Sequence, residues 1–459
     1  MTRRLLLVVL ATAVSSPMLA AELDWDAISG EATAMLRDYV RVDTSNPPGD
    51  EIEAARFLAA RFSAEGIEYQ IFESEPGRAS IIARLPGSGG ERPIVLLNHL
   101  DTVGADQAAW SHPTHAGEVE AGYLYGRGAI DCKGMAVVEA MAMFAIARSG
   151  QPIDRDIVFL GTADEETGGA LGAGWFVENH GELLRGAEFV LNEGGHGRVL
   201  DDGALVYEVG VVEKTPFWLR LTTRGEPGHG STPRGVSAVA RLVRALEKVR
   251  TMRHEIRVVP EVAAYYKALA PRQSERLRSR YLNLAESLED ESFRAEFLAR
   301  PEDAALVQST VSITVLKGSD KTNVVPARAS AELDCRLLPD ESPEKFLDEL
   351  RSAVDDDEVE IAAILDLPPS SSAIGTDLYR AIEVMAASEN AAVVPNVLRG
   401  FTDSHFFREK GIVAYGFVPV VLTDEDTHRE HGADERMPVR ELGAGTKRLV
   451  QVLRGLDGR

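Results

Sequence analysis

The stretch PIVLLNHLD, residues 93–101, is a short apolar run that ends in a histidine and an aspartate. A second run, DIVFLGTADEE at residues 156–166, ends in three acidic residues, and a third, EFVLNEGG at residues 188–195, carries Glu193 just after its apolar part. Apolar runs of this length, bounded by glycine and polar residues, are typical of buried strands. In an open α/β sheet, ligands bind at the carboxyl ends of the strands. The three runs therefore predict an α/β sheet with polar site residues along one edge.

Helical spacing surrounds these runs, and a different order of elements follows them. Residues 31–42, 51–65 and 134–148 repeat apolar residues at helical intervals, so runs and helices together predict an α/β domain. From residue 215 the pattern becomes strand, helix, strand, strand, helix, strand, the order of a ferredoxin-like domain. Residues 251–308, which are charged and helix-prone, interrupt that order as a helical insert. We therefore expect one α/β domain in two parts, residues 22–213 and 368–459, around an inserted α+β domain at residues 214–367.

The composition is that of a globular protein with a strongly acidic balance. A chain of 459 residues can bury more than one core, so its stability need not come from disulfides. Lysine and arginine number 49 against 72 aspartates and glutamates, which gives a net charge of −23. That charge repels phosphate backbones and no stretch gathers a basic cluster, so we expect no nucleic acid partner. Cys132 and Cys335 have no CxxC spacing, and we read both as packed thiols rather than as zinc ligands or a disulfide.

The first 21 residues differ from the rest of the chain. Arg3 and Arg4 precede an apolar run over residues 5–14, and small residues follow at Ala20 and Ala21. This is the pattern of a secretory signal peptide, and the run is too short to span a bilayer. We therefore expect residues 1–21 to direct export to a bacterial periplasm or the exterior, with no stable membrane insertion after cleavage. An uncleaved N-terminal anchor is the alternative.

Acidic residues and histidines gather in the loops that follow the predicted strands and near the C-terminus. Carboxylates collected in one crevice repel one another unless cations compensate them, and a divalent metal is the natural compensation. Imidazole and carboxylate ligands without thiolate suit zinc, with cobalt or manganese as substitutes. Any one of these residues could be a solvated loop residue, but three consecutive strand ends with such side chains favour a site. The candidates are His99, Asp101, Asp131, Asp164, Glu165, Glu166, Glu193, His431, Asp434 and Glu435.

Eight short motifs follow one another along the chain: NHLDTV, GRGAIDCKG, TADEETGG, NEGG, GHGSTP, NVVPARASAELDCRLLP, GFTDSHFF and HGADER. In order and spacing they resemble the dinuclear zinc aminoacylase and carboxypeptidase family, which includes succinyl-diaminopimelate desuccinylase, acetylornithine deacetylase, bacterial glutamate carboxypeptidase and carnosinase. The match covers nearly the whole chain after the signal peptide. It implies an α/β zinc-peptidase catalytic domain with a mixed sheet flanked by helices, and an inserted ferredoxin-like lid or dimerisation domain.

The resemblance also implies a ligand set for two zinc ions per chain. One ion would be held by His99 and Glu193, and the other by Glu166 and His431. Asp131 would bridge the two ions.

Further roles near these ligands come from the same resemblance. Glu165 would be the general base for a metal-bound hydroxide, and it would pass the proton to the leaving amine. Asp101 would orient His99 from behind, the usual role of a carboxylate next to a zinc imidazole. The family commonly has a non-proline cis peptide after the bridging aspartate, here Asp131–Cys132.

Residues of the inserted domain match the family's substrate contacts. His229 would stabilise the oxyanion of the tetrahedral intermediate, and in dimeric relatives this histidine comes from the other subunit. Asn323 and Arg336 would contact the substrate, and Arg336 offers the planar fork that fits a free carboxylate. Gly400 lies in the stretch that lines the pocket in relatives. A turn contact for His229 and a surface ion pair for Arg336 are the simpler alternatives, and a homodimer would form through the inserted domain.

We therefore expect an exported dinuclear zinc hydrolase that cleaves an amide or peptide bond next to a free carboxylate in a small molecule or short peptide. One alternative is an aminopeptidase or dipeptidase that reads a free amine, which the acidic residues Asp424, Glu425 and Asp426 leave open. A catalytically dead periplasmic binding protein is a weaker alternative, because all five ligand types and Glu165 are present.

Overall fold

Residues 22–200 and 202–457 are described by a computed structural model of the chain. The predicted signal peptide, residues 1–21, lies outside the described residues. Among the helices of the described part, none has both the length and the apolar character needed to cross a membrane.

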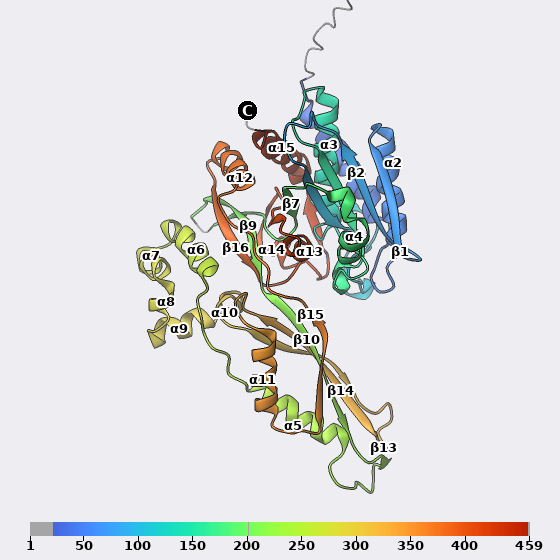
Figure 1. Cartoon of the computed structure of the whole chain (residues 1–459), viewed down its shortest axis with the longest axis vertical. Coiled ribbons are helices and arrows are strands. Elements are labelled where there is room, and N and C mark those ends of the chain that lie inside the picture. Colours follow the sequence, from blue (N-terminus) through green and yellow to red (C-terminus); the bar gives the residue numbers. More distant parts are fainter. Residues whose placement is uncertain (1–21, 201, 458–459) are drawn as a thin grey trace, which may run out of the picture.

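A mixed ten-stranded sheet forms the body of the molecule (Figure 1). Its central strands run parallel, whereas the pairs at the first edge and the pair between β17 and β9 are antiparallel. In spatial order the strands are β1 (Glu68–Glu75), β2 (Arg78–Leu85), β6 (Ile157–Thr162), β3 (Ile94–His99), β7 (Phe189–Asn192), β17 (Val413–Gly416), β9 (Leu205–Glu213), β8 (Gly197–Val199) and β18 (Val421–Leu422), with β16 (Ala392–Leu398) beside β9.

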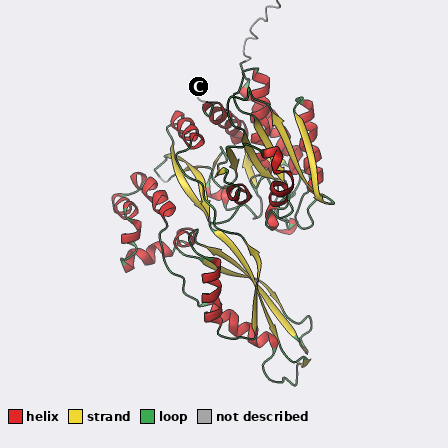
Figure 2. Ribbon diagram, viewed as in Figure 1, coloured by secondary structure: helices red, strands yellow, loops and turns green. Residues whose placement is uncertain are grey.

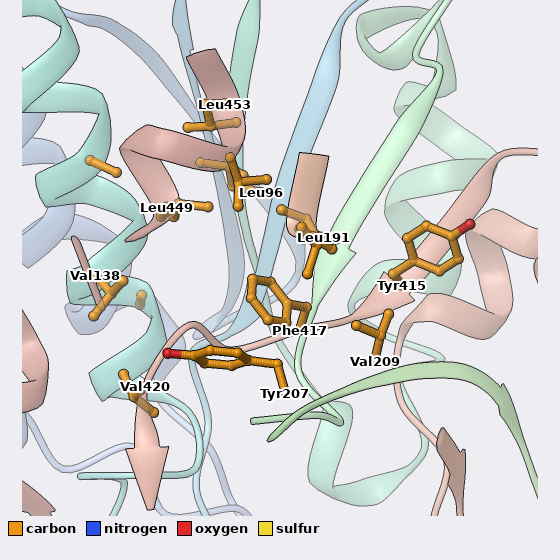
Figure 3. Packing of buried hydrophobic residues seen from close by; sticks show 14 of the residues in the cluster. Leu96, Val138, Leu191, Tyr207, Val209, Tyr415, Phe417, Val420, Leu449 and Leu453 are labelled. Atoms are coloured by element: carbon orange, nitrogen blue, oxygen red, sulfur yellow. The ribbon is translucent and has the colours of Figure 1, made fainter. Parts of the chain in front are cut away.

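The three apolar runs of the sequence become β3, β6 and β7, the buried centre of this sheet. Side chains of β3 alternate between the two faces: Ile94 and Leu96 join one apolar cluster, and Val95 and Leu97 join another. Leu96 packs with residues from several other elements in the larger cluster (Figure 3). A strand buried on both faces must be apolar throughout its length, which is why these runs were visible in the sequence.

Helices cover both faces of the sheet (Figure 2). The larger cluster holds α1 (Trp25–Val40), α2 (Glu51–Ala64), α3 (Lys133–Ser149), α12 (Asp377–Ser388) and α15 (Val439–Gly455), and the opposite face holds α4 (Ala173–His180) and α13 (Ser404–Glu409). Helix α1 begins at Trp25 rather than at residue 31, because the Asp24 side chain caps it by accepting from the Ala27 amide. Helices α2 and α3 match their predicted ranges to within a residue.

A second sheet, of four antiparallel strands, projects from the body (Figure 1). Its spatial order is β12 (Thr310–Lys317), β14 (Arg328–Leu337), β10 (Thr215–Arg224) and β15 (Val359–Asp366), with α5 (Ala238–Arg250) and α11 (Pro343–Val354) packed on one face. Numbered along the chain, the order is 2-3-1-4, as in a ferredoxin-like sheet. The predicted elements are thus present in the predicted order. We call this unit, residues 214–367 without the insert, the lid. The domain boundaries themselves stay a prediction.

The insert at residues 251–308 is helical. Its first residues contact the lid, where His254 stacks on Phe346 and Arg257 pairs with Asp340, and its later part packs on the body. Helix α6 (Pro260–Leu269) lies against β16, where Leu269, Val394 and Val206 form a small apolar cluster. The helices that follow are α7 (Glu275–Leu282), α8 (Leu284–Ser287), α9 (Glu291–Leu298) and α10 (Pro301–Val307).

Two small sheets complete the fold. A three-stranded sheet pairs β19 (Arg436–Pro438) with β5 (Tyr123–Tyr125) and β5 with β4 (Glu118–Glu120), so the HGADER segment lies against the chain that leads to Asp131. Helix α14 (Asp424–Thr427) precedes that segment. At the far end of the lid, β11 (Gly228–His229) pairs with β13 (Val324–Val325).

Candidate metal centre

His99 is the last residue of β3, and its two ring nitrogens face different groups. Nε2 lies 2.8 Å from Asp131 Oδ1 and 3.7 Å from Glu193 Oε1. Nδ1 lies 3.0 Å from the backbone oxygen of Asp101. The ring is fully buried, so its orientation is fixed from both sides and Nε2 is the nitrogen that faces the carboxylates.

A second group forms on the other oxygen of the same aspartate. His431 Nε2 lies 2.9 Å from Asp131 Oδ2 and 3.2 Å from Glu166 Oε2. The structure therefore brings the five predicted ligands together as two triads that share Asp131, each with ligand atoms within 4.8 Å of one another. Their role as ligands stays a prediction.

The charges of this cluster fit two divalent cations. In the described chain, the ion pairs of Asp131, Glu166 and Glu193 are with histidines alone, and no lysine or arginine neutralises them. Hydrogen bonds to Asp131 and Glu166 raise the pKa of His431 to about 10, so at neutral pH this imidazole is protonated and partly balances the carboxylates. Burial raises the pKa of Glu193 well above its usual range. Two imidazoles among three crowded carboxylates, without thiolate, are the donor set that zinc and similar ions prefer.

The loop that carries Asp131 is held by a buried acid from the C-terminal segment. Glu435 accepts hydrogen bonds from the amides of Ile130 and Asp131, at 2.8 and 3.1 Å, and its charge is balanced by Arg127 at 2.5 Å. The peptide bond between Asp131 and Cys132 is cis, as the family resemblance implies. The sequence placed Glu435 among the candidate site residues but gave it no role, because its partners lie about three hundred residues away.

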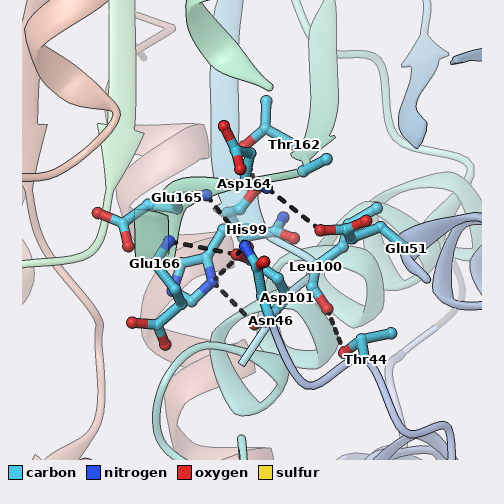
Figure 4. A network of polar contacts seen from close by, with 12 residues as sticks. Thr44, Asn46, Glu51, His99, Leu100, Asp101, Thr162, Asp164, Glu165 and Glu166 are labelled. Carbon is cyan, nitrogen blue, oxygen red and sulfur yellow. Dashed lines mark hydrogen bonds and ion pairs between the residues drawn. The ribbon is translucent and has the colours of Figure 1, made fainter. Parts of the chain in front are cut away.

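The turn that carries Glu165 and Glu166 is held by Asp101 (Figure 4). The buried Asp101 carboxylate accepts from the amides of both glutamates at 3.2 Å, and from the Asn46 side chain at 2.8 Å. It lies 3.5 Å from His99 Nδ1, so the backbone carbonyl is the closer partner of that ring. Asp101 therefore acts on the turn at least as directly as on His99. Asn46, which precedes two prolines, was not singled out in the sequence.

Glu165 differs from its neighbour because its carboxylate is kept apart from the ligand triads. It is 8% exposed, and no side chain of the described residues donates a hydrogen bond to its carboxylate. Burial and the nearby Glu193 raise the pKa of Glu165 well above its usual range. A buried, unengaged carboxyl group beside the ligands is suited to proton transfer.

The predicted lid residues do not gather in one place. His229 and Asn323 are exposed at the far tip of the lid, where the Gly230 amide donates to the Asn323 carbonyl and His229 Nδ1 contacts the Ser231 hydroxyl at 2.7 Å. Figure 1 shows β13 at the end of the lid remote from the body. Within one chain, the structure does not bring these two residues to the metal ligands.

Arg336 lies at the opposite end of the lid, next to the body. Its guanidinium pairs with Asp334 at 2.7 Å and lies over the rings of Trp218 and Phe401, with centroids 5.7 and 5.2 Å away. Phe401 follows Gly400 in an exposed bend after β16. The structure therefore brings Arg336 and the Gly400 segment together.

Cys132 and Cys335 are buried and free, as expected for packed thiols.

The acidic residues that left an amine-binding site open are largely engaged elsewhere. Asp426 is buried and pairs with Arg436 at 2.9 Å, and Glu425 pairs with Arg429 and Arg436.

Known proteins resemble this chain over most of its length. Residues 95–455 match the model of "Peptidase family M20/M25/M40". Aminoacylase-1A of Rattus norvegicus is 29% identical over 413 residues, which cover 88% of this chain and 91% of the relative. An N-fatty-acyl-amino acid synthase/hydrolase of Xenopus tropicalis is 28% identical over 419 residues, covering 86% and 78%.

Solved structures share the fold. An M20 family metallo-carboxypeptidase from Sulfolobus solfataricus superposes with a TM-score of 0.73 at 18% identity, over 94% of this chain and 100% of that one. Human carnosine dipeptidase 1 gives 0.71 at 18% identity, over 95% and 98%. The family match identifies an enzyme, and the mixed α/β fold agrees with it. The alternative of a catalytically dead binding protein is therefore wrong. The chain belongs to peptidase family M20/M25/M40, a family of enzymes that depend on two metal ions, and it is a hydrolase of the metallopeptidase and aminoacylase type.

Proposed function

We propose that this hydrolase is an exported enzyme that holds two zinc ions per chain and cleaves an amide bond beside a free carboxylate. The observation that carries the substrate assignment is the contact of Arg336 with Phe401. Two residues further on, Asp403 accepts a hydrogen bond from Thr162, the last residue of β6, at 2.6 Å. This loop links the guanidinium to the strand ends that carry the metal centre.

His99, Asp131 and Glu193 would hold one ion, and Asp131, Glu166 and His431 the other. When bound, such ions act as Lewis acids that polarise a carbonyl and make water a better nucleophile at neutral pH. The shared Asp131 fixes the spacing of the two triads, and Glu435 fixes Asp131.

Glu165 supplies the proton transfer in this proposal. Its carboxylate accepts a proton from the attacking water and delivers it to the nitrogen of the leaving amine, so that one group serves both steps. Its backbone amide is held by Asp101, which limits where the carboxyl group can point.

The carboxylate of the substrate would bind Arg336. Nε and Nη2 of Arg336 donate to Asp334 at 2.7 and 3.2 Å, whereas Nη1 is buried without a partner in the described structure, so the substrate carboxylate would accept from Nη1. The names of the relatives, an aminoacylase and an N-fatty-acyl-amino acid hydrolase, support the same substrate class. A site for a free amine is disfavoured because Glu425 and Asp426 already form ion pairs with arginines.

A second copy of the chain would complete the site. His229 lies at the lid tip, away from the metal centre of its own chain, so we place its role as an oxyanion donor at the metal centre of another subunit. The lid has a surface suited to such contact: β12 is an edge strand, and Val239 and Val243 of α5 and Leu316 of β12 are 37%, 60% and 66% exposed. An unpaired edge strand beside an apolar helix face is a typical surface for self-association.

We propose export from the signal pattern of residues 1–21. Cell fractionation with N-terminal sequencing of the mature protein tests it, and an intact N-terminus on a cytosolic protein would contradict it.

Metal uptake should release protons. Because the pKa of His431 is raised to about 10 in the metal-free protein, the imidazole is charged at pH 7 and must lose its proton to bind a cation. Zinc affinity should therefore rise with pH up to about 10. Calorimetric titration of the metal-free protein in two buffers with different ionisation enthalpies measures the protons released. His112→Gln, at a half-buried histidine that pairs with Glu118 and is not among the proposed ligands, should not change their number, and a heat independent of the buffer would contradict the prediction.

Ligation and proton transfer should separate by mutation. Glu165→Gln should keep both metal ions while kcat falls by about two to four orders of magnitude, the usual size of a general-base contribution. Asp131→Ala should lose metal together with activity, because both triads share that side chain. Elemental analysis and steady-state kinetics of the two variants decide this. Near-normal turnover of Glu165→Gln would remove Glu165 from the mechanism.

Carboxylate recognition should depend on Arg336. Arg336→Ala should lower kcat/KM for a free-acid substrate by about 10- to 100-fold, the value of hydrogen bonds to a charged group, and should have little effect on the amidated analogue. Arg220→Ala is the matched control. Arg220 lies on β10 of the same sheet, but its exposed guanidinium pairs with Glu332. If the wild-type enzyme used both substrates equally, the free-amine alternative would be favoured instead.

His229 should act between subunits. His229→Ala should lower kcat by about 100- to 1,000-fold, as for removal of one oxyanion donor. When His229→Ala and Glu165→Gln chains are co-expressed in equal amounts, mixed dimers regain one intact site, so about one quarter of wild-type activity should return if the chains pair at random. A mixture as inactive as its two components would mean that His229 acts within its own chain or not at all.

A further inference from the structure

Arg78, the first residue of β2, lies behind the turn that carries Glu165 and Glu166. Its Nη2 is 2.8 Å from Asp164 Oδ1 and 2.8 Å from Glu51 Oε1. Its Nη1 is 3.3 Å from Asn46 Oδ1 and 3.1 Å from the Pro48 carbonyl. The side chain is 12% exposed, so this is a largely buried cation with four oxygen acceptors rather than a surface ion pair.

Asp164 is the anchor of that turn. It is a non-glycine residue with φ of 69°, a left-handed conformation that costs about 1 kcal/mol or more and needs support from its surroundings. Its carboxylate accepts from the Thr167 hydroxyl and from the Leu171 amide at 2.9 Å, which closes the turn on itself. Arg78 bonds to the same carboxylate and compensates its charge.

Asn46 provides a second route to the turn. Its Oδ1 accepts from Arg78, and its Nδ2 donates to Asp101 at 2.8 Å and to the Thr167 hydroxyl at 3.1 Å. Asp101 in turn accepts from the amides of Glu165 and Glu166 (Figure 4). One guanidinium is therefore linked to both ends of the turn through two different partners.

The space around the guanidinium suits an arginine and little else. A Cβ on Gly49 would lie 2.8 Å from both Glu51 carboxylate oxygens and 2.9 Å from the Cζ atom of Arg78, so the loop before α2 closes tightly over the group. A lysine ammonium could replace the charge, but it lacks the planar fork that reaches Asp164 and Asn46 at once.

We propose that Arg78 is a positioning residue for hydrolysis, which acts through Asp164 and Asn46 to fix the 164–167 turn so that Glu165 and Glu166 face the metal centre. This inference rests on the function proposed for those two glutamates. It requires no contact between Arg78 and the substrate, because the guanidinium bonds to Asp164 and to residues at or before the start of α2, and to neither Glu165 nor Glu166.

The same strand offers a matched control. Arg84, six positions along β2, pairs with Asp156 at 2.7 Å and donates to the Leu183 carbonyl. Asp156 precedes β6, whereas Asp164 follows it, so the two arginines brace opposite ends of one strand and only Arg78 reaches the turn.

The test compares Arg78→Met, Arg78→Lys and Arg84→Met by kinetics and by amide hydrogen exchange of the metal-free protein. Arg78→Met should lower kcat by roughly 100-fold with KM within about threefold, since a small misplacement of catalytic groups costs that much. The amides of Glu165 and Glu166 should exchange faster, and added guanidinium ion should restore part of kcat. Arg78→Lys should fold and lie between wild type and Arg78→Met in both measurements. Arg84→Met should match wild type in kcat, in KM and in amide exchange.

Two results would overturn the inference: unchanged exchange of the Glu165 and Glu166 amides in the Arg78 variants, or wild-type kcat in Arg78→Lys together with exchange equal to wild type. If Arg78→Met fails to fold, Arg78→Lys carries the same comparison. If the wild-type protein hydrolyses none of the substrates, the proposed function fails, and the exchange measurement alone still decides whether Arg78 holds the turn.

Discussion

The Asp131 carboxylate turns one oxygen toward each of two imidazoles, and the rest of the site is arranged around that shared side chain. Glu193 and Glu166 stand on either side, so three carboxylates meet where no lysine or arginine of the described chain pairs with them. Such crowding is relieved by protons or by cations. Hydrogen bonds to Asp131 and Glu166 raise the pKa of His431 to about 10, so in the metal-free protein this imidazole carries a proton at neutral pH. The ligand atoms are therefore preformed, and the cost of assembling them is met by the fold before any metal binds.

Buried ion pairs, more than apolar packing, hold this arrangement. Glu435 with Arg127 fixes the loop before Asp131, and Asp164 with Arg78 fixes the turn after β6. Removing charges from water is costly, and a buried pair often contributes little net stability. Here the buried pair orients the loop instead, because a carboxylate that accepts hydrogen bonds from several backbone amides restricts the loop to one conformation. Apolar side chains could fill the same volume, but they could not orient the amides of neighbouring ligands.

The sequence predicted those parts of the site that depend on one strand and the loop directly after it. The strands β3, β6 and β7 were predicted because they are buried on both faces, and their polar ends met because parallel strands end at one edge. Asn46, Arg78 and Glu435 were not assigned roles, because each acts through partners far along the chain and is locally an ordinary polar residue. The packing of α6 on β16 was equally invisible, since a helix pattern does not say which surface it will cover. For His229, the sequence matched a family motif, but only the structure separates it from the metal ligands of its own chain.

Charge also explains why a separate residue must select the substrate. Asp101, Asp131, Glu165, Glu166 and Glu193 together carry five negative charges when ionised, and two divalent ions would bring four positive charges, so the loaded centre has no net positive charge. Such a centre does not attract a carboxylate over a distance. The surrounding protein, with a net charge of −23, repels it. A substrate that carries a free carboxylate therefore needs local hydrogen-bond donors. In the proposed function these are at Nη1 of Arg336, whose guanidinium lies over the Phe401 ring and pairs with Asp334 through its other nitrogens. The loop that contains Asp403 joins Phe401 to the strand ends.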